Sequence, residues 1–577
     1  MISTDRQTGY PSVDKPWLMY FSDEQKQSEC PQWTGYQRMK DNCRKYSARV
    51  AIDYYGKKYT YKELLGKIDE TADALATQGI KEGDYVSICS LATPECIFAF
   101  YALNKIGAVC NMIEPRTNAD RILFNINNTN SSALLVLDAF LDKIESIKGK
   151  IKTEKIIVLR TTESMPFFYK SAFGISAKGK NINAGYKRFD GLKWEQIVCE
   201  RISGKAKEVS FAPNTPIGIV YTGGTTGVPK GAVVSSTAFA NFAYGTPFSA
   251  PQIYASKVFL DIMPPFIAYG LVFGMLIPFC AGLKCILIPA FKVEDFPRLL
   301  KKHKPNCVVG VPSFYESLLH CREFTHRKLD FLTCAIAGGD KLLPETENAV
   351  NEFFKSHGCK SKIYKGYGMT EMGSAVTFTT SDECNEVGSV GISSIVSNVK
   401  ICDEVTGEEL KYNAQGDIYL SGPTMMYGYF GNPEETSKVM QTDDKGVTWI
   451  RTGDIGYVSE NGILYVIDRK KRMIIRPDGY NVWPSLIEAV VVKHDAVADC
   501  CVIGTPNPNG NSGKIPTAVI VLNEGYEDIE SIINEVNEIS RKSLPERDMA
   551  LRYEIIDKMP VTDVGKVDYM ALERMFA

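Results

Sequence analysis

Hydrophobic and polar positions along the chain follow two periods, and their alternation predicts an α/β fold. Apolar positions recur at helical spacing from Leu64 to Leu75, as expected for one face of an amphipathic helix. Apolar runs of strand length follow at 133–137, 155–160, 217–221, 285–289, 307–312 and 333–339. Strands separated by helical segments are typical of parallel sheets with helices on both faces.

Local signals place several of these elements. Thr60 is followed three residues later by Glu63, which is the pattern of a capping box at a helix start. Residues 79–89 predict a turn followed by a strand, and residues 94–107 predict the next helix.

The last hundred residues predict a separate, small α+β unit. Strands are expected at 499–504, 516–522 and 552–557, an amphipathic helix within 527–543, and a terminal helix from Val567. A chain of 577 residues also exceeds what one hydrophobic core holds, about 250–300 residues. With the charged stretch 468–472 as linker, we expect domains at 1–470 and 471–577.

Two segments depart from this pattern. Residues 262–283 carry no charge and match a membrane span in length, but three prolines divide them, which favours a buried helix beside a pocket. Within 161–210, aromatic and basic residues are mixed. This indicates a surface insertion packed on the domain or, alternatively, a peripheral membrane or acyl-carrier contact through 165–190.

Composition narrows the class of protein. The apolar and charged fractions, 44% and 23%, are those of globular proteins. A net charge of −2 provides no bulk field for nucleic acid or anionic membranes. Sixteen cysteines without a C-x-x-C pair, and an N-terminus without an apolar signal core, favour a cytoplasmic protein with no transmembrane segment.

The sequence YTGGTTGVPKG, residues 221–231, directly follows a predicted strand and predicts a phosphate-binding loop. Glycines let backbone N–H groups turn toward phosphate oxygens, while threonine hydroxyls and a lysine add donors and charge. The spacing differs from the G-x-x-x-x-G-K-[ST] loop. The alternative interpretation is a Gly/Thr-rich hairpin.

This loop resembles that of the adenylate-forming superfamily, which contains acyl- and aryl-CoA ligases, luciferases and the adenylation domains of peptide synthetases. Four further motifs of that family follow in order: YGMTE at 367–371, RTGD at 451–454, DRKKRMI at 468–474 and PVTDVGK at 560–566. The resemblance runs from about Tyr59 to the C-terminus. It implies a large N-terminal domain with two doubly wound sheets plus a small β-barrel, and a small α+β C-terminal domain.

The resemblance also implies roles for individual residues. Tyr367 covers the adenine, Thr370 binds phosphate, Glu371 holds the Mg²⁺ that accompanies ATP, and Asp454 and Arg469 contact the ribose. Lys566 acts in adenylate formation, so Lys566, Thr370 and Glu371 are the catalytic candidates. The ATP/AMP-binding set is Thr222, Gly223, Gly224, Thr225, Thr226, Gly227, Lys230, Gly338, Gly339, Asp340, Gly366, Tyr367, Gly368, Met369, Asp454 and Arg469.

By the same resemblance, Lys471 is the hinge about which the small domain rotates, and Gly479 and Tyr480 line the CoA tunnel. One apparently extra residue precedes Gly479, which leaves open whether Ile475 or Arg476 takes a commonly basic position.

The acyl pocket of the family matches Phe266, Ile267, Tyr269, Ser313 and Phe314. Many relatives have a histidine where this chain has Ile267, and amino-acid-activating members place an aspartate nearby, whereas none lies between Met263 and Cys280. An apolar wall without that charge favours a carboxylic acid lacking an α-amino group.

These features together predict an ATP-dependent, AMP-forming acyl-CoA ligase that uses ATP, Mg²⁺ and CoA. Two alternatives stay open: an adenylating enzyme that loads a carrier-protein phosphopantetheine, and a non-catalytic nucleotide-binding relative. The sequence identifies neither the acid nor the oligomeric state.

Overall fold

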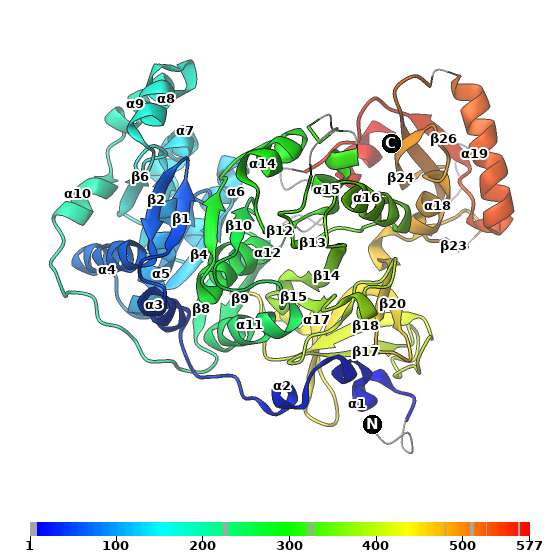
Figure 1. Ribbon diagram of the computed structural model, residues 1–577, viewed down its shortest axis with the longest axis horizontal. Helices are drawn as coiled ribbons and strands as arrows, with labels where there is room; N and C mark the ends of the chain where they lie inside the picture. Colours follow the sequence, from blue (N-terminus) through cyan, green and yellow to red (C-terminus); the bar gives the residue numbers. More distant parts are fainter. Residues whose placement is uncertain are drawn as a thin grey trace.

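The structure is a computed structural model, and it describes residues 8–222, 229–319, 321, 323–324, 328–478, 480–507, 513–526, 528–562 and 566–576. Two large sheets with their covering helices form most of the molecule, a third sheet lies below them, and a small C-terminal unit lies beside α15 and α16 (Figure 1). This arrangement confirms the predicted α/β class.

The central sheet has nine strands in the order β16-β15-β14-β13-β12-β10-β11-β1-β2. Its middle strands are parallel, and β2, β15 and β16 pair antiparallel at the two edges. The strands are β1 (Val50–Tyr54), β2 (Lys57–Thr60), β10 (Val258–Asp261), β11 (Lys284–Leu287), β12 (Cys307–Gly310), β13 (Cys334–Gly338), β14 (Ile363–Met369), β15 (Ser374–Phe378) and β16 (Ile392–Ser393).

The second sheet has seven strands in the order β7-β6-β5-β3-β4-β8-β9, parallel except for β9. Its strands are β3 (Tyr85–Cys89), β4 (Val109–Ile113), β5 (Ala133–Leu137), β6 (Ile156–Leu159), β7 (Leu192–Lys193), β8 (Pro216–Tyr221) and β9 (Gly231–Ser235). Every strand predicted from an apolar run in these two sheets is present, with bounds that differ by a few residues at most.

Helices fill the space between and around the sheets. The predicted capping box is confirmed, since the Thr60 side chain accepts from the Glu63 backbone N–H at the start of α4. The helices of this part are α1 (Pro11–Asp14), α2 (Asp23–Gln27), α3 (Gly35–Lys45), α4 (Tyr61–Thr77), α5 (Pro94–Ile106), α6 (Ala119–Asn128), α7 (Leu141–Ile147), α8 (Phe167–Ile175), α9 (Ala177–Arg188), α10 (Trp194–Cys199), α11 (Ser236–Ser249), α12 (Ala268–Gly270), α13 (Ile277–Ala281), α14 (Phe296–His303), α15 (Pro312–Leu319), α16 (Pro344–Ser356) and α17 (Pro433–Val439).

The uncharged segment 262–283 is buried, as predicted, but it is not one regular helix. A π-helix at Leu271–Leu276 lies between α12 and α13, and most of the segment packs into one large hydrophobic core, while Ile262 and Met263 belong to a second core. Among the described residues, no helix is both long and apolar enough to cross a membrane. All sixteen cysteines are free and most are buried, in keeping with their predicted role as small core residues.

A third, antiparallel sheet within residues 398–469 takes the place of the small β-barrel that the family resemblance implied. Its strands are β17 (Asn398–Cys402), β18 (Gly416–Ser421), β19 (Met440–Thr442), β20 (Thr448–Val458) and β21 (Leu464–Arg469). Strand β20 carries the RTGD motif and pairs with β21, which ends at Arg469. Pairing of these consecutive strands places Asp454 of the RTGD motif opposite Arg469 of the DRKKR motif.

The C-terminal unit is α+β, as predicted, and has its own hydrophobic core, which includes Ile487, Val502, Ile520 and Val536. Its elements are β22 (Ile474–Ile475), β23 (Asn481–Val482), α18 (Pro484–Val491), β24 (Val497–Pro506), β25 (Lys514–Leu522), α19 (Ile529–Ser543), β26 (Arg552–Ile555) and α20 (Tyr569–Met575). Strand β25 lies between β24 and β26.

Candidate active site

The candidate site lies at the carboxyl ends of β13 and β14, the edge at which open α/β sheets bind ligands. The two strands are parallel neighbours, with Gly338 paired to Gly366. Gly339 and Asp340 follow the first strand, and the second ends at Met369 before a short 3₁₀ turn, Thr370–Met372. The sheet therefore brings AGGDKL and YGMTE together although they are separated in sequence.

The glycines of these motifs are required by backbone packing. A Cβ on Gly368 would lie 2.1 Å from the carbonyl oxygen of Ser374, and one on Gly338 would lie 2.9 Å from that of Gly366. Gly339 has φ +80°, a conformation that other residues rarely adopt. The glycine pattern thus has a structural cause that is independent of any ligand.

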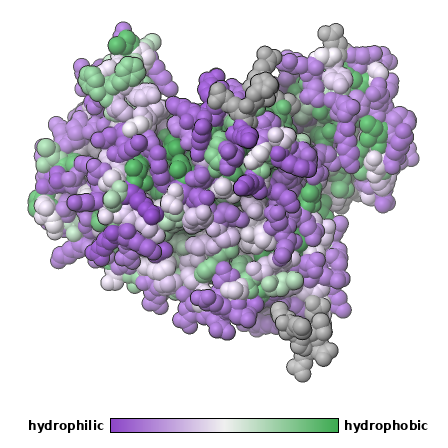
Figure 2. Space-filling model, viewed as in Figure 1, coloured by the Kyte–Doolittle hydropathy of each residue, from purple (hydrophilic) through white to green (hydrophobic). Residues whose placement is uncertain are grey.

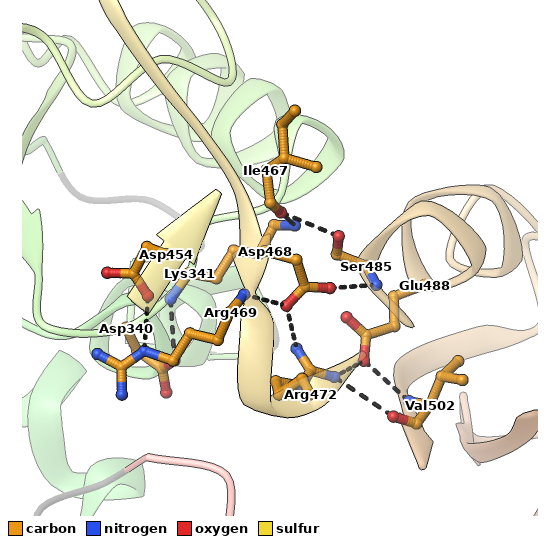
Figure 3. Close-up of polar contacts among 10 residues, drawn as sticks. All are labelled: Asp340, Lys341, Asp454, Ile467, Asp468, Arg469, Arg472, Ser485, Glu488 and Val502. Carbon is orange, nitrogen blue, oxygen red and sulfur yellow. Dashed lines mark hydrogen bonds and ion pairs between the residues drawn. The ribbon is translucent and has the colours of Figure 1, made fainter. Parts of the chain in front are cut away.

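Tyr367, Asp454 and Arg469 form one hydrogen-bonded group. The Tyr367 hydroxyl donates to Asp454 Oδ2 at 2.6 Å, and Arg469 Nε donates to Asp454 Oδ1 at 3.0 Å (Figure 3 shows the second bond). Asp454 is buried, which raises its pKa, while the charge of Arg469 opposes that shift. The Arg469 side chain is 64% exposed and that of Asp454 is 2% exposed, so the guanidinium reaches the surface while the carboxylate is held beneath it.

Glu371 and Lys230 are joined through Tyr429. The Tyr429 hydroxyl donates to Glu371 Oε1 at 2.5 Å, and Lys230 Nζ lies 5.3 Å from the centroid of the Tyr429 ring. Lys230 also forms an ion pair with Glu435. The sequence analysis did not identify Tyr429 or Glu435, because no local pattern connects them to the motif residues.

The predicted phosphate loop is described only at its two ends. Thr222 N–H donates to the carbonyl oxygen of Lys230 at 3.0 Å, so these residues extend the antiparallel pair β8–β9. The ends therefore form the hairpin named as the alternative, and a hairpin of this kind is compatible with a phosphate loop. Five predicted residues lie outside the described part of the chain: Gly223, Gly224, Thr225, Thr226 and Gly227.

Lys566 of the small domain lies at the same site. Its backbone is fixed by two hydrogen bonds with Thr562, one at 2.7 Å and one at 3.2 Å. Burial lowers the pKa of Lys566, the nearby carboxylate of Asp340 opposes this shift, and Arg469 adds to it. Lys566 is therefore close enough to interact electrostatically with two members of the predicted nucleotide site.

A polar network connects the end of β21 with the C-terminal unit (Figure 3). Arg472 Nη2 lies 2.5 Å from Glu488 Oε1, and Ser485 N–H donates to Asp468 Oδ2 at 2.9 Å. Lys341 Nζ, next to Asp340, donates to the carbonyl oxygen of Ile467 at 2.7 Å. This network holds the DRKKR segment between the domains. Sequence reasoning did not find Lys341, Ser485 or Glu488, because each contact joins distant segments.

The predicted hinge residue, Lys471, is exposed, whereas Tyr480, predicted to line the CoA tunnel, packs against an arginine. Lys471 is exposed in the 3₁₀ turn Lys470–Arg472, directly after β21. The guanidinium of Arg547 lies 4.7 Å from the centroid of the Tyr480 ring. Arg476 donates to the carbonyl oxygen of Arg547 at 2.7 Å, whereas Ile475 is exposed. Gly479, the predicted tunnel glycine, lies outside the described residues.

Three predicted pocket residues lie along the buried segment. Phe266 is buried, Ile267 is partly buried between two hydrophobic cores, and the Tyr269 hydroxyl donates to the carbonyl oxygen of Gly310 at 3.3 Å. A Cβ on Gly338 would lie 3.1 Å from that hydroxyl. Tyr269 therefore connects the apolar segment with the nucleotide motif AGGDKL.

The other two predicted pocket residues lie on α15. The Phe314 ring packs on Phe291 at 5.1 Å and on Phe296 at 5.8 Å between centroids, inside a hydrophobic core. Ser313 is partly buried beside it. The role of both residues in an acyl pocket stays a prediction.

Asp261 is a buried carboxylate that the sequence analysis passed over. It ends β10, two residues before the interval searched for an aspartate, and is 1% exposed. Neither carboxylate oxygen has a side-chain partner among the described residues, the backbone N–H of Met263 is the one group that counters its rise in pKa, and a Cβ on Gly274 would lie 2.8 Å from Oδ1. Burial raises the pKa of Asp261 to about 7. The uncharged segment therefore packs against a titratable group.

Carboxylates of both domains also meet near the site. Burial and the nearby Asp499 and Asp340 raise the pKa of Glu316 to about 8. Burial raises the pKa of Asp499 in β24 to about 6. Lys566 brings positive charge to Asp340, and Lys341 brings it to Asp468 and Glu488.

The described residues contain no group of three or more His, Cys, Asp or Glu side chains able to hold a metal ion. Glu371 offers one buried carboxylate beside the phosphate-loop hairpin. That arrangement fits a Mg²⁺ ion carried mainly by nucleotide phosphates, because Mg²⁺ commonly binds through one or two carboxylates together with phosphates and water.

Comparison with known proteins identifies the family. Residues 39–430 match the AMP-binding enzyme family, and residues 486–566 match the AMP-binding enzyme C-terminal domain. The chain therefore belongs to the AMP-binding enzymes, the adenylate-forming superfamily expected from the motifs.

Similar proteins are CoA ligases of several kinds. A long-chain-fatty-acid–CoA ligase of Bacillus subtilis (strain 168) is 28% identical over 569 residues, which covers 96% of each chain. A 4-coumarate–CoA ligase of Vanilla planifolia is 25% identical, covering 91% of this chain and 90% of that one. The crystal structure of the anthranilate CoA ligase AuaEII in complex with anthranoyl-AMP superposes with a TM-score of 0.80 at 19% sequence identity. The superposition covers 95% of this chain and 98% of that one. That structural likeness confirms the fold.

Proposed function

We propose that this chain is an ATP-dependent acid–thiol ligase, which adenylates a carboxylic acid and transfers the acyl group to CoA. The observation that supports the proposal most is the electrostatic interaction of the buried Lys566 with Asp340 and Arg469. A small-domain cation at the predicted nucleotide site suits a reaction in which negative charge develops on phosphate and carboxylate oxygens.

In the first step, a carboxylate oxygen of the acid attacks the α-phosphorus of ATP. The bond from that phosphorus to the bridging oxygen breaks, and pyrophosphate leaves with the electron pair, giving acyl-AMP. We assign Tyr367 to the adenine, Asp454 and Arg469 to the ribose, and Thr370 and Lys230 to phosphate. Lys566 neutralises charge in the transition state.

In the second step, the CoA thiolate attacks the acyl carbonyl carbon and AMP leaves, which gives a thioester. We propose that the small domain, residues 471–577, rotates about Lys471 and carries Lys566 away, while Gly479 and Tyr480 come to line the path of the thiol. The large domain would then comprise residues 1–470. Glu371 would hold Mg²⁺ on the phosphates, where the ion offsets their charge.

The proposed substrate is a carboxylic acid without an α-amino group, held along Phe266, Ile267 and Tyr269, with Ser313 and Phe314 as further candidates. The names of the relatives include both fatty and aromatic acids, so they support an acyl- or aryl-CoA ligase in general. The many buried free cysteines favour a reducing compartment, and we propose the cytoplasm.

Two other functions are alternatives to a CoA ligase. A carrier-protein phosphopantetheine could replace CoA as the thiol. A non-catalytic nucleotide-binding relative would have no need to retain Glu371, Asp454 and Lys566 together, which disfavours that alternative.

The test is a screen of short, medium-chain, long-chain and aromatic acids by pyrophosphate release, with and without CoA. Acyl-CoA formation with stoichiometric AMP would support the proposal. Pyrophosphate release with hydroxamate trapping but no consumption of CoA would favour a carrier protein. Nucleotide binding without turnover of any acid would overturn the assignment as a ligase.

A further inference from the structure

The helices α8 and α9 form a hairpin that projects from the seven-stranded sheet, at the upper left of Figure 1. Helix α8 has no buried residue. The side chains of Phe167, Phe168 and Ile175 are 86%, 76% and 74% exposed, and Tyr169 is 41% exposed. Large apolar residues gathered at this exposure mark an interaction surface on soluble proteins.

Basic residues surround these apolar side chains. From residue 164 to residue 189 the sequence contains no Asp or Glu, while five residues are basic: Lys170, Lys178, Lys180, Lys187 and Arg188. Four of the five are exposed and Lys170 is partly exposed. Figure 2 shows hydrophobic side chains gathered over this projection, with hydrophilic ones beside them.

The end of α9 attaches the hairpin to the domain, so the exposed apolar side chains of α8 are presented on a fixed support. Tyr186 and Phe189 are buried in the core of the seven-stranded sheet domain. The Tyr186 hydroxyl donates to Glu195 at 2.5 Å, and the guanidinium of Arg160 lies 4.6 Å from the centroid of its ring. The two helices also pack closely, because a Cβ on Gly179 would lie 1.8 Å from the carbonyl oxygen of Phe173.

We propose that the α8–α9 hairpin docks the protein on an anionic lipid surface. Phe167, Phe168 and Ile175 enter the headgroup region, and the basic side chains contact lipid phosphates. Exposed aromatic and aliphatic residues combined with lysine, without acidic side chains, are the composition that binds this interface. Basic residues close to an anionic leaflet are attracted to it, and every charged residue between 164 and 189 is basic, so this attraction acts locally although the net charge of the whole chain is −2.

The test is co-sedimentation of the full-length protein, without ATP, with vesicles of phosphatidylglycerol and phosphatidylcholine or of phosphatidylcholine alone. We expect binding to the anionic vesicles, weakening with salt. The double variant Phe167→Ser/Phe168→Ser should reduce that binding about tenfold or more, since each ring loses its apolar contact. Lys178→Glu/Lys180→Glu should reduce it as well.

The matched control is Val405→Ser, at a residue 93% exposed in the turn after β17, far along the chain from the hairpin. It should leave lipid binding unchanged. Circular dichroism and ATP binding show whether each hairpin variant is folded. If Phe167→Ser/Phe168→Ser fails to fold, the binding of Lys178→Glu/Lys180→Glu to anionic vesicles tests the proposal.

Equal sedimentation of the folded variants and the unaltered protein would overturn the proposal. So would absence of binding to the anionic vesicles. If light scattering then showed a dimer that the Phe167→Ser/Phe168→Ser variant dissociates, the hairpin would be a contact between copies instead. Because lipid binding is measured without substrate, the outcome is independent of the proposed ligase activity.

Discussion

The hydroxyl of Tyr367 donates to Oδ2 of Asp454 across 2.6 Å, although the two residues are 87 positions apart. The other oxygen of Asp454 accepts from Arg469. Both carboxylate oxygens are thus oriented before any nucleotide binds, and each keeps a lone pair for a ribose hydroxyl. The predicted adenine-covering tyrosine is therefore also a positioning residue for the predicted ribose-binding aspartate.

Tyr367→Phe tests this relationship. The variant keeps the ring but removes the hydrogen bond to a charged group, which contributes about 1.5–3 kcal/mol. We expect KM for ATP to rise about tenfold or more, with a smaller change in kcat. Tyr457→Phe is the control, since Tyr457 stacks on Tyr465 in the third sheet. Equal effects of the two variants would contradict a specific role for the Tyr367 hydroxyl.

Lys566→Ala separates the two half-reactions. If Lys566 serves adenylate formation, the rate of that step should fall by at least about 10²-fold, the scale of one lost oxyanion-type contact. Thioester formation from supplied acyl-AMP should be nearly unchanged. Both rates are measured by rapid quench. Equal loss in both steps would argue against domain rotation. Lys558→Ala is a matched control, because Lys558 pairs with Glu294 across the same two domains.

Glu371→Gln tests the proposed magnesium ligand. The substitution preserves shape and the Tyr429 contact but removes the charge, so the apparent affinity for MgATP should fall. High Mg²⁺ should restore part of the loss if Glu371 coordinates the ion. Initial rates are measured over a Mg²⁺ series at fixed ATP. An unaltered Mg²⁺ dependence would return Glu371 to a structural role.

Comparing phenylalanine with 3-phenylpropanoate tests the substrate class. The two acids share their shape and differ in the amine, and burying an unpaired ammonium against an apolar wall costs several kcal/mol. The deaminated acid should react faster by orders of magnitude in the pyrophosphate-release assay. A preference for phenylalanine would point to amino-acid activation, and Asp261→Asn would then show whether the buried Asp261 holds the amine.

Asp261 also predicts a pH dependence of stability. Burial raises its pKa from 3.8 to about 7, so between these values the native protein holds a proton that the unfolded chain has lost. Stability therefore falls as pH rises through this window and levels off above it. The cost reaches at most on the order of 4 kcal/mol.

Asp261→Asn removes this titration. Its Tm, relative to that of the unaltered protein, should increase from pH 5 to pH 8. Asp444→Asn, at an exposed position, is the control and should show no such trend. A difference in Tm that is constant across pH would mean that Asp261 does not titrate in this range.

The order of the motifs and the alternation of apolar runs were sufficient to predict the family, the α/β class and most strands. These features are local: strand and helix periods depend on neighbouring residues, and the capping box at Thr60 involves a side chain three positions away. Lys566, Glu371 and Asp454 could likewise be named from their motifs. Their roles stay predictions until the substitutions above are made.

The tertiary structure decided which groups meet. Asp261 drew no attention in the sequence because nothing local distinguishes it, yet packing of the π-helix segment buries it against Gly274. Lys341 reaches the carbonyl oxygen of Ile467, 126 positions away, because the third sheet and the small domain pack beside β13. Such contacts depend on how sheets and domains pack in three dimensions, and periodicity along one segment carries no information about that arrangement.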